Sequence, residues 1–440
     1  MLISFSVENF RSIRQRQTLS LVRAGGGTVS RVTDDEKTLA GGDISPLAVI
    51  FGPNASGKST VLTAVDYVHW VVRNSARREV GQPLPADPFL LDAESRGRPF
   101  STEVWFTVGP REFGYSFTLA GGRVVAEQLR ESIRGPAKRS VRTLFTRQAD
   151  GTISTSSHLP GPKRAIIAAT RPNSLFLSKA AQENFRPLLE VYGWFADLEL
   201  TIESATPDWL EGDRGVRRLE SDPRYKPWIE NLLRQADLGV TDVTVAAPDS
   251  PPPDDLVRLV TAISGAGSKS WVTEQLSQAI KQPQLVHRDA RGDAGGTALP
   301  WGLESRGTRS LWDLAGEVYE SLGTGQTLVV DEVGSLHPAL VRAILEMYQF
   351  RQTNPKNAQL IFTSHDISLL GSWGGQGFVL DRDQIWFTDK DPSNSTNLIP
   401  LTDFKPRRDE DTERMYIQSR FGAFPSVGQL SLPFEWGAGE

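Results

Sequence analysis

The sequence predicts an α/β protein whose main sheet is split by a long, mostly helical insertion. A short apolar run (47–51, LAVIF) precedes a glycine-rich loop, and apolar residues at helical spacing follow over 59–73. Two further apolar runs, TLVVDE (327–332) and QLIFTSHD (359–366), come far downstream. Apolar runs without alternation are typical of strands buried on both faces of a sheet. These runs therefore predict one sheet whose two halves flank the insertion.

The first 158 residues contain more strands than a simple alternation of strands and helices requires. Residues 3–7 alternate apolar and polar side chains, which predicts a half-buried opening strand. EVWFTV (103–108), FGYSFTL (113–119) and RVVAEQL (123–129) are typical of antiparallel strands, the last two joined by a hairpin at Gly121-Gly122. A second hairpin is expected near Asp150-Gly151. This lobe should therefore carry an antiparallel side sheet.

Four segments are predicted along the chain. They are an N-terminal lobe (1–158), the mostly helical insertion (159–285), a C-terminal lobe (286–400) and a charged tail (401–440). The insertion includes helical stretches at 179–198 and 222–238 and a proline-rich break at 247–255. The C-terminal lobe should contain helices near 308–322 and 338–350 and a last strand at 384–389. We interpret the tail as a solvated surface helix, with a docking surface for a partner as the alternative.

Composition narrows the class of protein. The 440 residues are 39% hydrophobic and 23% charged, which is ordinary for a soluble globular chain of more than one domain. The net charge of −5 argues against a broadly basic nucleic-acid binder. The absence of cysteine excludes disulfides, thiolate metal sites and thiol catalysis and suits a reducing cytosol. No apolar run approaches the roughly 20 residues of a membrane helix, so we expect a soluble, cytoplasmic protein with no membrane partner.

The strongest motif is the loop between the strand 47–51 and the helix that follows it. It fits the pattern GxxxxGK[ST], whose backbone N–H groups surround phosphate oxygens at the start of a helix. Lys58 should neutralise the β- and γ-phosphates, and the Ser59 hydroxyl should bind Mg²⁺. The predicted nucleotide-binding residues are Gly52, Pro53, Asn54, Ala55, Ser56, Gly57, Lys58, Ser59 and Thr60.

Two downstream strand ends supply the remaining polar groups of a nucleotide hydrolase. Asp331 follows a buried strand and is expected to hold the Mg²⁺ ion, as Walker-B acids do. Glu332 is placed to orient or deprotonate the attacking water. His365 ends the next apolar strand, where a neutral imidazole can donate a hydrogen bond to the γ-phosphate. We predict Glu332 and His365 as catalytic residues.

The motifs occur in the order found in ABC-type ATPases. LESRGTRSL (303–311) opens a helix before the Asp-Glu strand, and by itself predicts only an N-capped helix. In ABC-type ATPases a Ser-Gly signature at this place clamps the γ-phosphate of the opposite subunit, which here would be done by Ser305 and Gly307. The large insertion and the opening ISFSVENFRSI (3–13) resemble the SMC-like branch of these ATPases. The resemblance implies that Arg11 touches the nucleotide, although a solvated edge arginine fits the sequence equally well.

Finer details resemble AAA-type ATPases of abortive-infection and phage-exclusion loci, of the RloA and AbiL types. SRGT resembles their shortened signature, and DEVGSLHP, NSLFLSKAAQ (173–182) and the tail resemble their corresponding runs. The resemblance implies ATP and Mg²⁺ as ligands and a homodimer or a higher even-numbered homo-oligomer. It also implies a role in anti-phage defence, with a separate nuclease-like effector, such as a Toprim-type nuclease, encoded in the same locus.

The sequence departs from the ABC pattern at three places. Arg306 stands where the signature usually has glycine. The position of Gln82 in the sequence does not identify it as the glutamine of a Q-loop. Ser335-Leu336-His337-Pro338 replaces the usual D-loop, so His337 is an interface residue or, as we prefer, the start of a helix.

Two other functions remain alternatives. One is a DNA-repair or chromosome-maintenance ATPase that clamps DNA, although an insertion of roughly 120 residues without sustained heptads is too short for the coiled coil of such clamps. The other is a nucleotide-sensing scaffold with little turnover. The sequence leaves several properties open. They are the trigger, the effector, the preference for ATP or GTP, the oligomer size, the binding of DNA or of a phage component, and the roles of the insertion and tail.

Overall fold

In the computed structural model, the chain divides into two compact units. Unit 1 comprises residues 1–196 and 361–440, and unit 2 comprises residues 197–360. The residues described are 1–23, 43–134, 139–201, 213–246, 252, 254–264, 268–279, 281–288, 296–332, 336–372, 378–405 and 410–422. Residues 159–196, predicted as part of the insertion, belong to unit 1. The limits of the four predicted functional segments stay a prediction, since compact units and functional lobes are different divisions of a chain.

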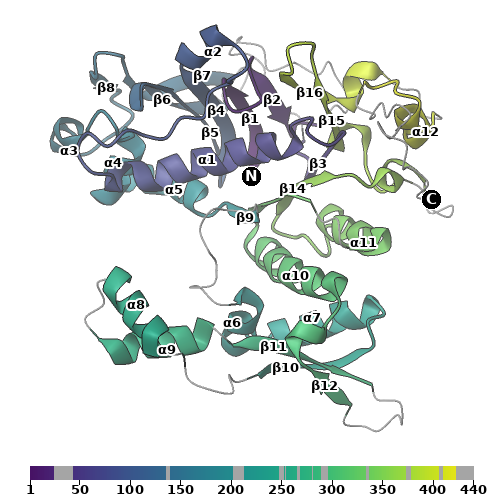
Figure 1. The fold of residues 1–440 in the computed structure, drawn as a ribbon. Coiled ribbons are helices and arrows are strands. Elements are labelled where there is room, and N and C mark those ends of the chain that lie inside the picture. Colours follow the sequence, from purple (N-terminus) through teal and green to yellow (C-terminus); the bar gives the residue numbers. More distant parts are fainter. Residues whose placement is uncertain are drawn as a thin grey trace, which may run out of the picture. The chain divides into compact units, whose positions relative to one another are not determined.

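The larger sheet of unit 1 is antiparallel and has the order β2-β1-β4-β5-β6-β7-β8 (Figure 1). Its strands are β1 (Leu2–Glu8), β2 (Gln17–Ser20), β4 (Phe100–Val108), β5 (Arg111–Ala120), β6 (Arg123–Arg134), β7 (Arg139–Arg147) and β8 (Ile153–Thr155). Both predicted hairpins form, because β5 pairs with β6 and β7 with β8. The predicted side sheet is thus confirmed. The predicted opening strand forms as β1, but the prediction that it is half-buried is wrong, since Ser4 and Ser6 are buried as completely as their apolar neighbours.

The second sheet of unit 1 has the strand order β16-β15-β3-β14. Its strands are β3 (Leu47–Phe51), β14 (Gln359–Ser364, whose first two residues belong to unit 2), β15 (Ile385–Lys390) and β16 (Thr396–Pro400). All five residues of β3 are buried, as the apolar run LAVIF predicts. β15 runs parallel to β3, and β16 returns antiparallel to β15. With the helices described next, these strands confirm the predicted α/β class.

Three helices of unit 1, α1, α4 and α5, pack together (Figure 1). The helices of unit 1 are α1 (Lys58–Asn74), α2 (Ala93–Gly97), α3 (Arg164–Ala169), α4 (Phe176–Gln182), α5 (Arg186–Ala196) and α12 (Thr412–Ile417), with 3₁₀ turns η1 (Ser75–Arg77), η4 (Ile367–Leu370), η5 (Arg382–Gln384) and η6 (Leu401–Phe404). The predicted tail helix corresponds to α12, and residues 423–440 lie outside the described part of the chain.

A buried carboxylate fixes the first turn of α4 to the antiparallel sheet. Glu127 on β6 accepts hydrogen bonds from the backbone N–H groups of Phe176 at 2.7 Å and Leu177 at 3.0 Å. It also accepts one from the Tyr115 hydroxyl at 2.8 Å. A carboxylate at a helix N-terminus satisfies amides that have no partner within the helix. Burial nevertheless raises the pKa of Glu127 above its ordinary value, because a charge removed from water is unfavourable.

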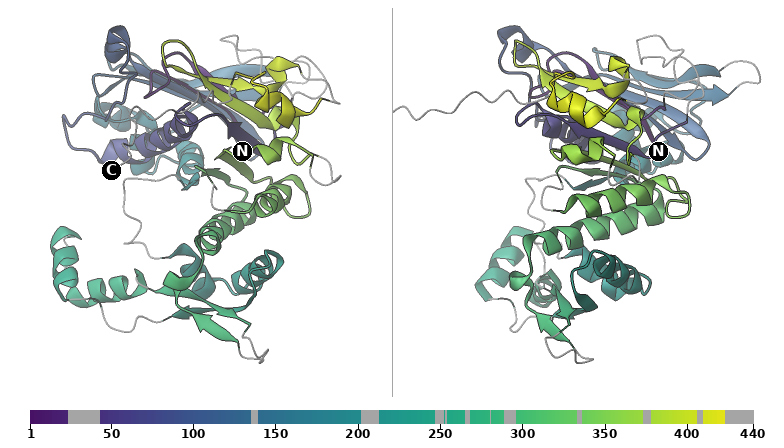
Figure 2. Two further views of the ribbon diagram at one scale, coloured as in Figure 1. Left: turned by 45° about the vertical axis from the view of Figure 1, so that its right-hand side comes forward. Right: turned by 90° about the vertical axis from the view of Figure 1, so that its right-hand side faces the viewer.

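Unit 2 combines a parallel strand pair, two long helices and the insertion. β9 (Glu199–Thr201) pairs in parallel with β13 (Thr327–Val330). The antiparallel sheet β10 (Val240–Ala246), β11 (Gln282–His287) and β12 (Thr297–Leu299) was not predicted. The helices are α6 (Arg214–Ser221), α7 (Tyr225–Gln235), α8 (Asp254–Ser264), α9 (Lys269–Ala279), α10 (Arg306–Thr324) and α11 (Pro338–Gln349), with the 3₁₀ turn η3 (Trp301–Leu303). Helix α6 packs against α10, and α8 packs against α9; these helices lie in the teal to green part of the ribbon in Figure 2.

Within the described ranges, no helix combines the length and apolar character that crossing a membrane requires.

Candidate functional site

The predicted phosphate loop joins the buried strand β3 to the long helix α1. Three of its residues have positive φ: Gly52 at 156°, Ala55 at 62° and Gly57 at 105°. Turns that mix right-handed and left-handed residues direct successive N–H groups to one side and form a concave site for anions. Gly57 immediately precedes the first residue of α1, so the N-terminal end of the helix dipole opens at the loop. This backbone suits a phosphate group.

Lys58 lies at the loop although only 6% of it is exposed. Its ammonium group donates hydrogen bonds to the carbonyl oxygens of Gly52 at 2.8 Å and Pro53 at 3.0 Å. A buried ammonium needs such acceptors, because removing its charge from water is otherwise costly. The loop thus already contains a positive charge at the place where phosphate oxygens are predicted to lie.

The other loop residues divide between the protein interior and solvent. Asn54, Ala55 and Ser59 are exposed, so their side chains are accessible to a ligand. Ser56 is buried, and its hydroxyl lies 2.6 Å from the Thr388 hydroxyl. Thr60 accepts a hydrogen bond from Ser12 at 3.0 Å. The nucleotide-binding roles assigned to these residues stay predictions.

The structure brings His365 to the phosphate loop. His365 directly follows β14, which is the neighbour of β3 in the sheet order, and its side chain is exposed. Its Nδ1 atom lies 3.5 Å from the ammonium nitrogen of Lys58. Two residues that are far apart in the sequence are therefore adjacent at one end of the sheet. This position suits the predicted phosphate-side donor, and the catalytic role itself remains a prediction.

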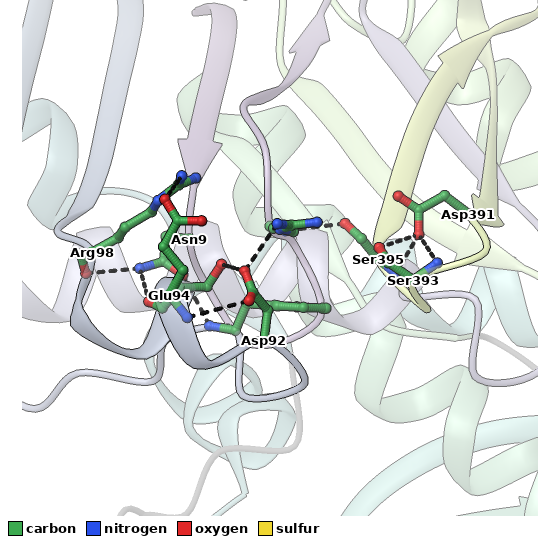
Figure 3. Close-up of polar contacts among 10 residues, drawn as sticks. Asn9, Asp92, Glu94, Arg98, Asp391, Ser393 and Ser395 are labelled. Atoms are coloured by element: carbon green, nitrogen blue, oxygen red, sulfur yellow. Dashed lines mark hydrogen bonds and ion pairs between the residues drawn. The ribbon is translucent and has the colours of Figure 1, made fainter.

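Side-chain contacts hold the segment after β1 to residues 92–98 and to the turn at Ser395 (Figure 3). Asn9 is buried with φ 54°, and its side chain donates to the carbonyl oxygens of Ser95 at 2.9 Å and Arg98 at 2.8 Å. Arg11 pairs with Asp87 at 3.3 Å, and its side chain is 48% exposed. The pairing agrees with an edge arginine, and contact between Arg11 and a nucleotide stays a prediction.

The predicted Walker-B residues lie in unit 2, at the end of β13. Asp331 is half-buried, and Glu332 is exposed with φ 54°, an unusual backbone conformation for glutamate. Such conformations concentrate at functional sites, where the surrounding fold maintains them. Of the divergent D-loop, Ser335 lies outside the described residues. His337 is the N-cap of α11 and accepts a hydrogen bond from the Ala339 N–H at 3.2 Å, which confirms its interpretation as a helix start.

The signature-like turn forms the N-terminus of α10. Ser305 is the N-cap, and its hydroxyl accepts a hydrogen bond from the Thr308 N–H at 3.0 Å. Gly307 lies in the first turn. Glu304, just before the cap, is buried and lies 2.8 Å from Nε2 of His287 on β11. The predicted N-capped helix is confirmed, and a contact between Ser305 and a second subunit stays a prediction.

Side chains of helix α10 form hydrogen bonds with residues at the start of α6 in the insertion. Arg214 on α6 donates to the buried carboxylate of Glu317 at 3.0 Å. The Trp312 indole donates to Asp213, the N-cap residue of α6, at 3.1 Å. Removal of Arg214 would leave the buried Glu317 carboxylate without this cation, which is unfavourable because its charge has been removed from water. The signature helix and the insertion therefore form one packed body within unit 2.

Each of the two predicted Mg²⁺ ligands, taken by itself, offers an oxygen of the kind that the ion binds. Mg²⁺ retains several waters and takes only one or two protein oxygen ligands in addition to substrate phosphates. Ser59 offers an exposed hydroxyl at the start of α1, and Asp331 offers a carboxylate at the end of β13. Among the described residues no group of three or more His, Asp or Glu side chains could hold a metal ion by itself.

Sequence reasoning missed the residues that support the phosphate loop from inside the protein. They are Ser12, Thr388 and Thr396, whose hydroxyls contact the loop or each other. Thr396 and Ser56 are 340 residues apart in the chain. No local pattern marks such residues, and only Ser12 belongs to a motif that was singled out.

Comparisons with known proteins give a family and a likeness to solved structures. No curated protein sequence matches the chain significantly. The crystal structure of the Smc head bound to the C-winged helix domain of ScpA is similar at a TM-score of 0.39 and 11% identity, covering 92% of this chain and 99% of that chain. The family described as "AAA domain, putative AbiEii toxin, Type IV TA system" matches residues 47–371, from the first residue of β3 to the turn after His365. With its phosphate loop, its Asp-Glu strand end and this match over most of its length, the chain belongs to that AAA domain family of ATPases.

Proposed function

We propose that this protein is a Mg²⁺-dependent ATPase that acts as a nucleotide switch of the ABC type in bacterial anti-phage defence. The observation that carries the proposal is the phosphate loop with Lys58 and His365. A buried ammonium group, an exposed imidazole 3.5 Å from it and a left-handed turn all lie at the N-terminus of α1. Each of these groups stabilises phosphate oxygens by charge or by hydrogen bonding.

Each of the predicted site residues has a separate role in the proposed hydrolysis. Lys58 compensates the charge of the β- and γ-phosphates, and His365 donates to the γ-phosphate. Ser59 and Asp331 hold Mg²⁺, which neutralises charge that develops on the phosphate oxygens. Glu332 orients the attacking water and accepts its proton. The roles of Asp331 and Glu332 rest on the motif and on their place after β13.

A second copy of the chain completes each nucleotide site in this proposal. Ser305 caps α10, so its hydroxyl and the first N–H groups of the helix stand at a helix N-terminus that favours anions. The γ-phosphate held at Lys58 of one subunit would lie against Ser305 and Gly307 of the other. Arg306, in place of the usual glycine, adds a positive charge to this contact. Closure on ATP and reopening after hydrolysis make the dimer, or a higher even-numbered oligomer, a switch.

The biological role is supported by sequence resemblance and by the description of the family. The signature SRGT, the run 173–182 and the tail resemble abortive-infection ATPases of the RloA and AbiL types. The matching family is described as a putative toxin of type IV toxin–antitoxin systems, which are two-component systems by name. We therefore propose that the switch works in the cytoplasm, responds to infection and controls a separate nuclease-like effector from the same locus.

ATP hydrolysis by the purified protein and its Glu332→Gln variant tests the proposed activity. Wild type should release phosphate from ATP only with Mg²⁺. The variant should bind nucleotide normally and lose hydrolysis by about 100-fold, since general base catalysis contributes about 10²- to 10⁴-fold. Glu183→Gln at the C-cap of α4, which alters an exposed ion pair with Lys179, is the matched control. Unchanged hydrolysis in Glu332→Gln would show that the assignment of the catalytic base is wrong.

Phage plating on cells that carry the locus tests the biological role. Protection should require both this gene and the effector gene, and should be lost with Glu332→Gln. Salt-sensitive, tight DNA binding by the purified protein without any effect on phage plating would instead support a DNA clamp.

A further inference from the structure

The two glycines of the phosphate loop pack directly against one β-hairpin, formed by β15 and β16. A Cβ atom added to Gly52 would lie 2.4 Å from the Thr388 hydroxyl oxygen, and one added to Gly57 would lie 2.1 Å from the Thr396 hydroxyl oxygen. Real Cβ atoms do not approach other atoms so closely. Both glycines are therefore required by the hairpin behind the loop, in addition to their positive φ angles.

Strand register explains why these two threonines reach the loop. β15 pairs in parallel with β3 so that Phe387 stands opposite Phe51, and Thr388 is therefore level with Gly52. β16 pairs with β15 so that Thr396 stands opposite Lys390. Thr388 and Thr396 are both fully buried, at 0% exposure. The hairpin thus extends the sheet beyond the end of β3 and places two hydroxyls beneath the loop.

The hydroxyls bind the loop through its backbone and through Ser56. Thr396 donates to the Ser56 carbonyl oxygen at 2.9 Å. The Ser56 hydroxyl lies 2.6 Å from that of Thr388, which donates to the Phe51 carbonyl oxygen at 3.3 Å. The ammonium group of Lys390 donates to the Thr396 hydroxyl at 3.1 Å, and burial lowers the pKa of this lysine. Both ends of the phosphate loop are held by this network.

The turn between β15 and β16 fixes the position of Thr396 (Figure 3). The Asp391 carboxylate accepts hydrogen bonds from the N–H groups of Ser393 at 2.8 Å and Ser395 at 2.9 Å. The Ser395 hydroxyl accepts a hydrogen bond from the Arg14 N–H at 3.2 Å, and the Arg14 side chain pairs with Asp92 at 3.0 Å. The hairpin is therefore anchored to the segment that follows β1, and the Thr396 N–H donates to the Ser12 carbonyl oxygen at 2.8 Å.

We infer that the β15–β16 hairpin holds the phosphate loop in its phosphate-binding shape, and that Thr388 and Thr396 are positioning residues for nucleotide binding. The inference rests on the proposed nucleotide site. Neither hydroxyl needs to touch the nucleotide, because each acts through the loop backbone. A loop that is already ordered loses less conformational entropy when it binds phosphate, so loss of these contacts should weaken binding.

Thr396→Val tests the inference because it removes the hydroxyl and keeps the shape of the side chain. Thr102→Val on β4 is the matched control, since Thr102 is also buried and donates to a carbonyl oxygen, that of Ser6, at 2.9 Å. Both variants should lower the melting temperature, and Thr396→Val should lower it more, because the Thr396 hydroxyl also accepts a hydrogen bond from Lys390. Only Thr396→Val should weaken binding of a fluorescent methylanthraniloyl ATP with Mg²⁺, by about 2- to 10-fold for one hydrogen bond. Thr396→Ser, which keeps the hydroxyl, should bind like wild type.

Hydrogen–deuterium exchange of the nucleotide-free protein gives a readout that does not depend on ATP. Exchange at residues 52–60 should be faster in Thr396→Val than in wild type and unchanged in Thr102→Val. Equal affinities for Thr396→Val and Thr102→Val, or equal weakening by Thr396→Ser and Thr396→Val, would overturn the inference. If Thr396→Val does not fold, Thr388→Val takes its place with the same expected results. A wild-type protein that binds no nucleotide would refute the proposed function, while the exchange experiment would still decide the role of the hairpin.

Discussion

Replacement of Lys58 by methionine tests the geometry of the phosphate loop most directly. Methionine has a similar length and removes only the ammonium group, which donates to the carbonyl oxygens of Gly52 and Pro53. The ammonium therefore has two functions in our interpretation. Before nucleotide binds, it donates hydrogen bonds to the carbonyl oxygens of the loop. After nucleotide binds, it neutralises phosphate charge.

The expected size of each effect of the Lys58→Met substitution follows from these contacts. Loss of the two hydrogen bonds at the buried Gly52 and half-buried Pro53 should cost about 2 kcal/mol of stability. That corresponds to a melting temperature about 4–8 °C lower in a domain of this size. Loss of charge-assisted bonds to phosphate, worth about 1.5–3 kcal/mol, should weaken ATP binding by about 10- to 150-fold.

Thermal unfolding with and without Mg²⁺ and ATP separates the two effects of Lys58→Met. At a nucleotide concentration of about 100 times the dissociation constant, wild type gains about 2.7 kcal/mol of stability, whereas a variant that binds 100-fold more weakly gains only about 0.4 kcal/mol. Lys179→Met on α4, whose ammonium also has two acceptors, is the control and should keep the full nucleotide-dependent shift. A nucleotide-dependent shift of wild-type size in Lys58→Met would refute the assignment of the loop as the phosphate site.

Three further predictions concern catalysis, assembly and pH. Glu332→Gln should trap ATP in a stable dimer, which size-exclusion chromatography with light scattering would detect; a monomer at saturating ATP would contradict closure around the nucleotide. Ser305→Ala should cost about 1 kcal/mol as a lost helix cap and should be inactive alone, yet mixing it with Lys58→Met should restore part of the hydrolysis, because one site of each mixed dimer is then intact. No recovery would argue against a contact in trans. Glu127→Gln should change the pH dependence of unfolding by urea. Burial raises the folded pKa of Glu127 above its ordinary value, so its stabilising contribution is present below that ordinary value and is lost as pH rises through the folded pKa. Wild type should therefore lose stability relative to the variant as pH rises from below the ordinary glutamate pKa through the folded pKa of Glu127, and a constant difference would contradict a raised pKa.

Much of the fold follows from local patterns. The run LAVIF forms the buried strand β3, the glycine pair Gly121-Gly122 joins β5 to β6, and Ser305 caps α10 as its sequence predicts. These features depend on residues within a few positions of each other, through backbone sterics, capping and the period of apolar side chains. The phosphate loop belongs to the same class, because strand, glycines, lysine and helix are contiguous.

Other features required the tertiary structure because they join distant segments. The alternation in β1 predicts one solvated face, yet Ser4 and Ser6 are buried, because both edges of β1 are paired and its polar face is covered. The strands β10 to β12 escaped prediction because their sequences lie among helices and because β10 pairs with β11 only across α8 and α9.

The contrast is clearest at the phosphate loop. The sequence alone predicts which residues face the phosphates, since eight consecutive positions match the phosphate-loop pattern. The residues beneath the loop are known only from the tertiary structure. Folding brings Thr388 and Thr396 within hydrogen-bond distance of a loop that is more than 300 residues away in the sequence. Hydrogen bonds depend on distance in space, and a hydroxyl that serves such a contact has the same local sequence as one that faces water.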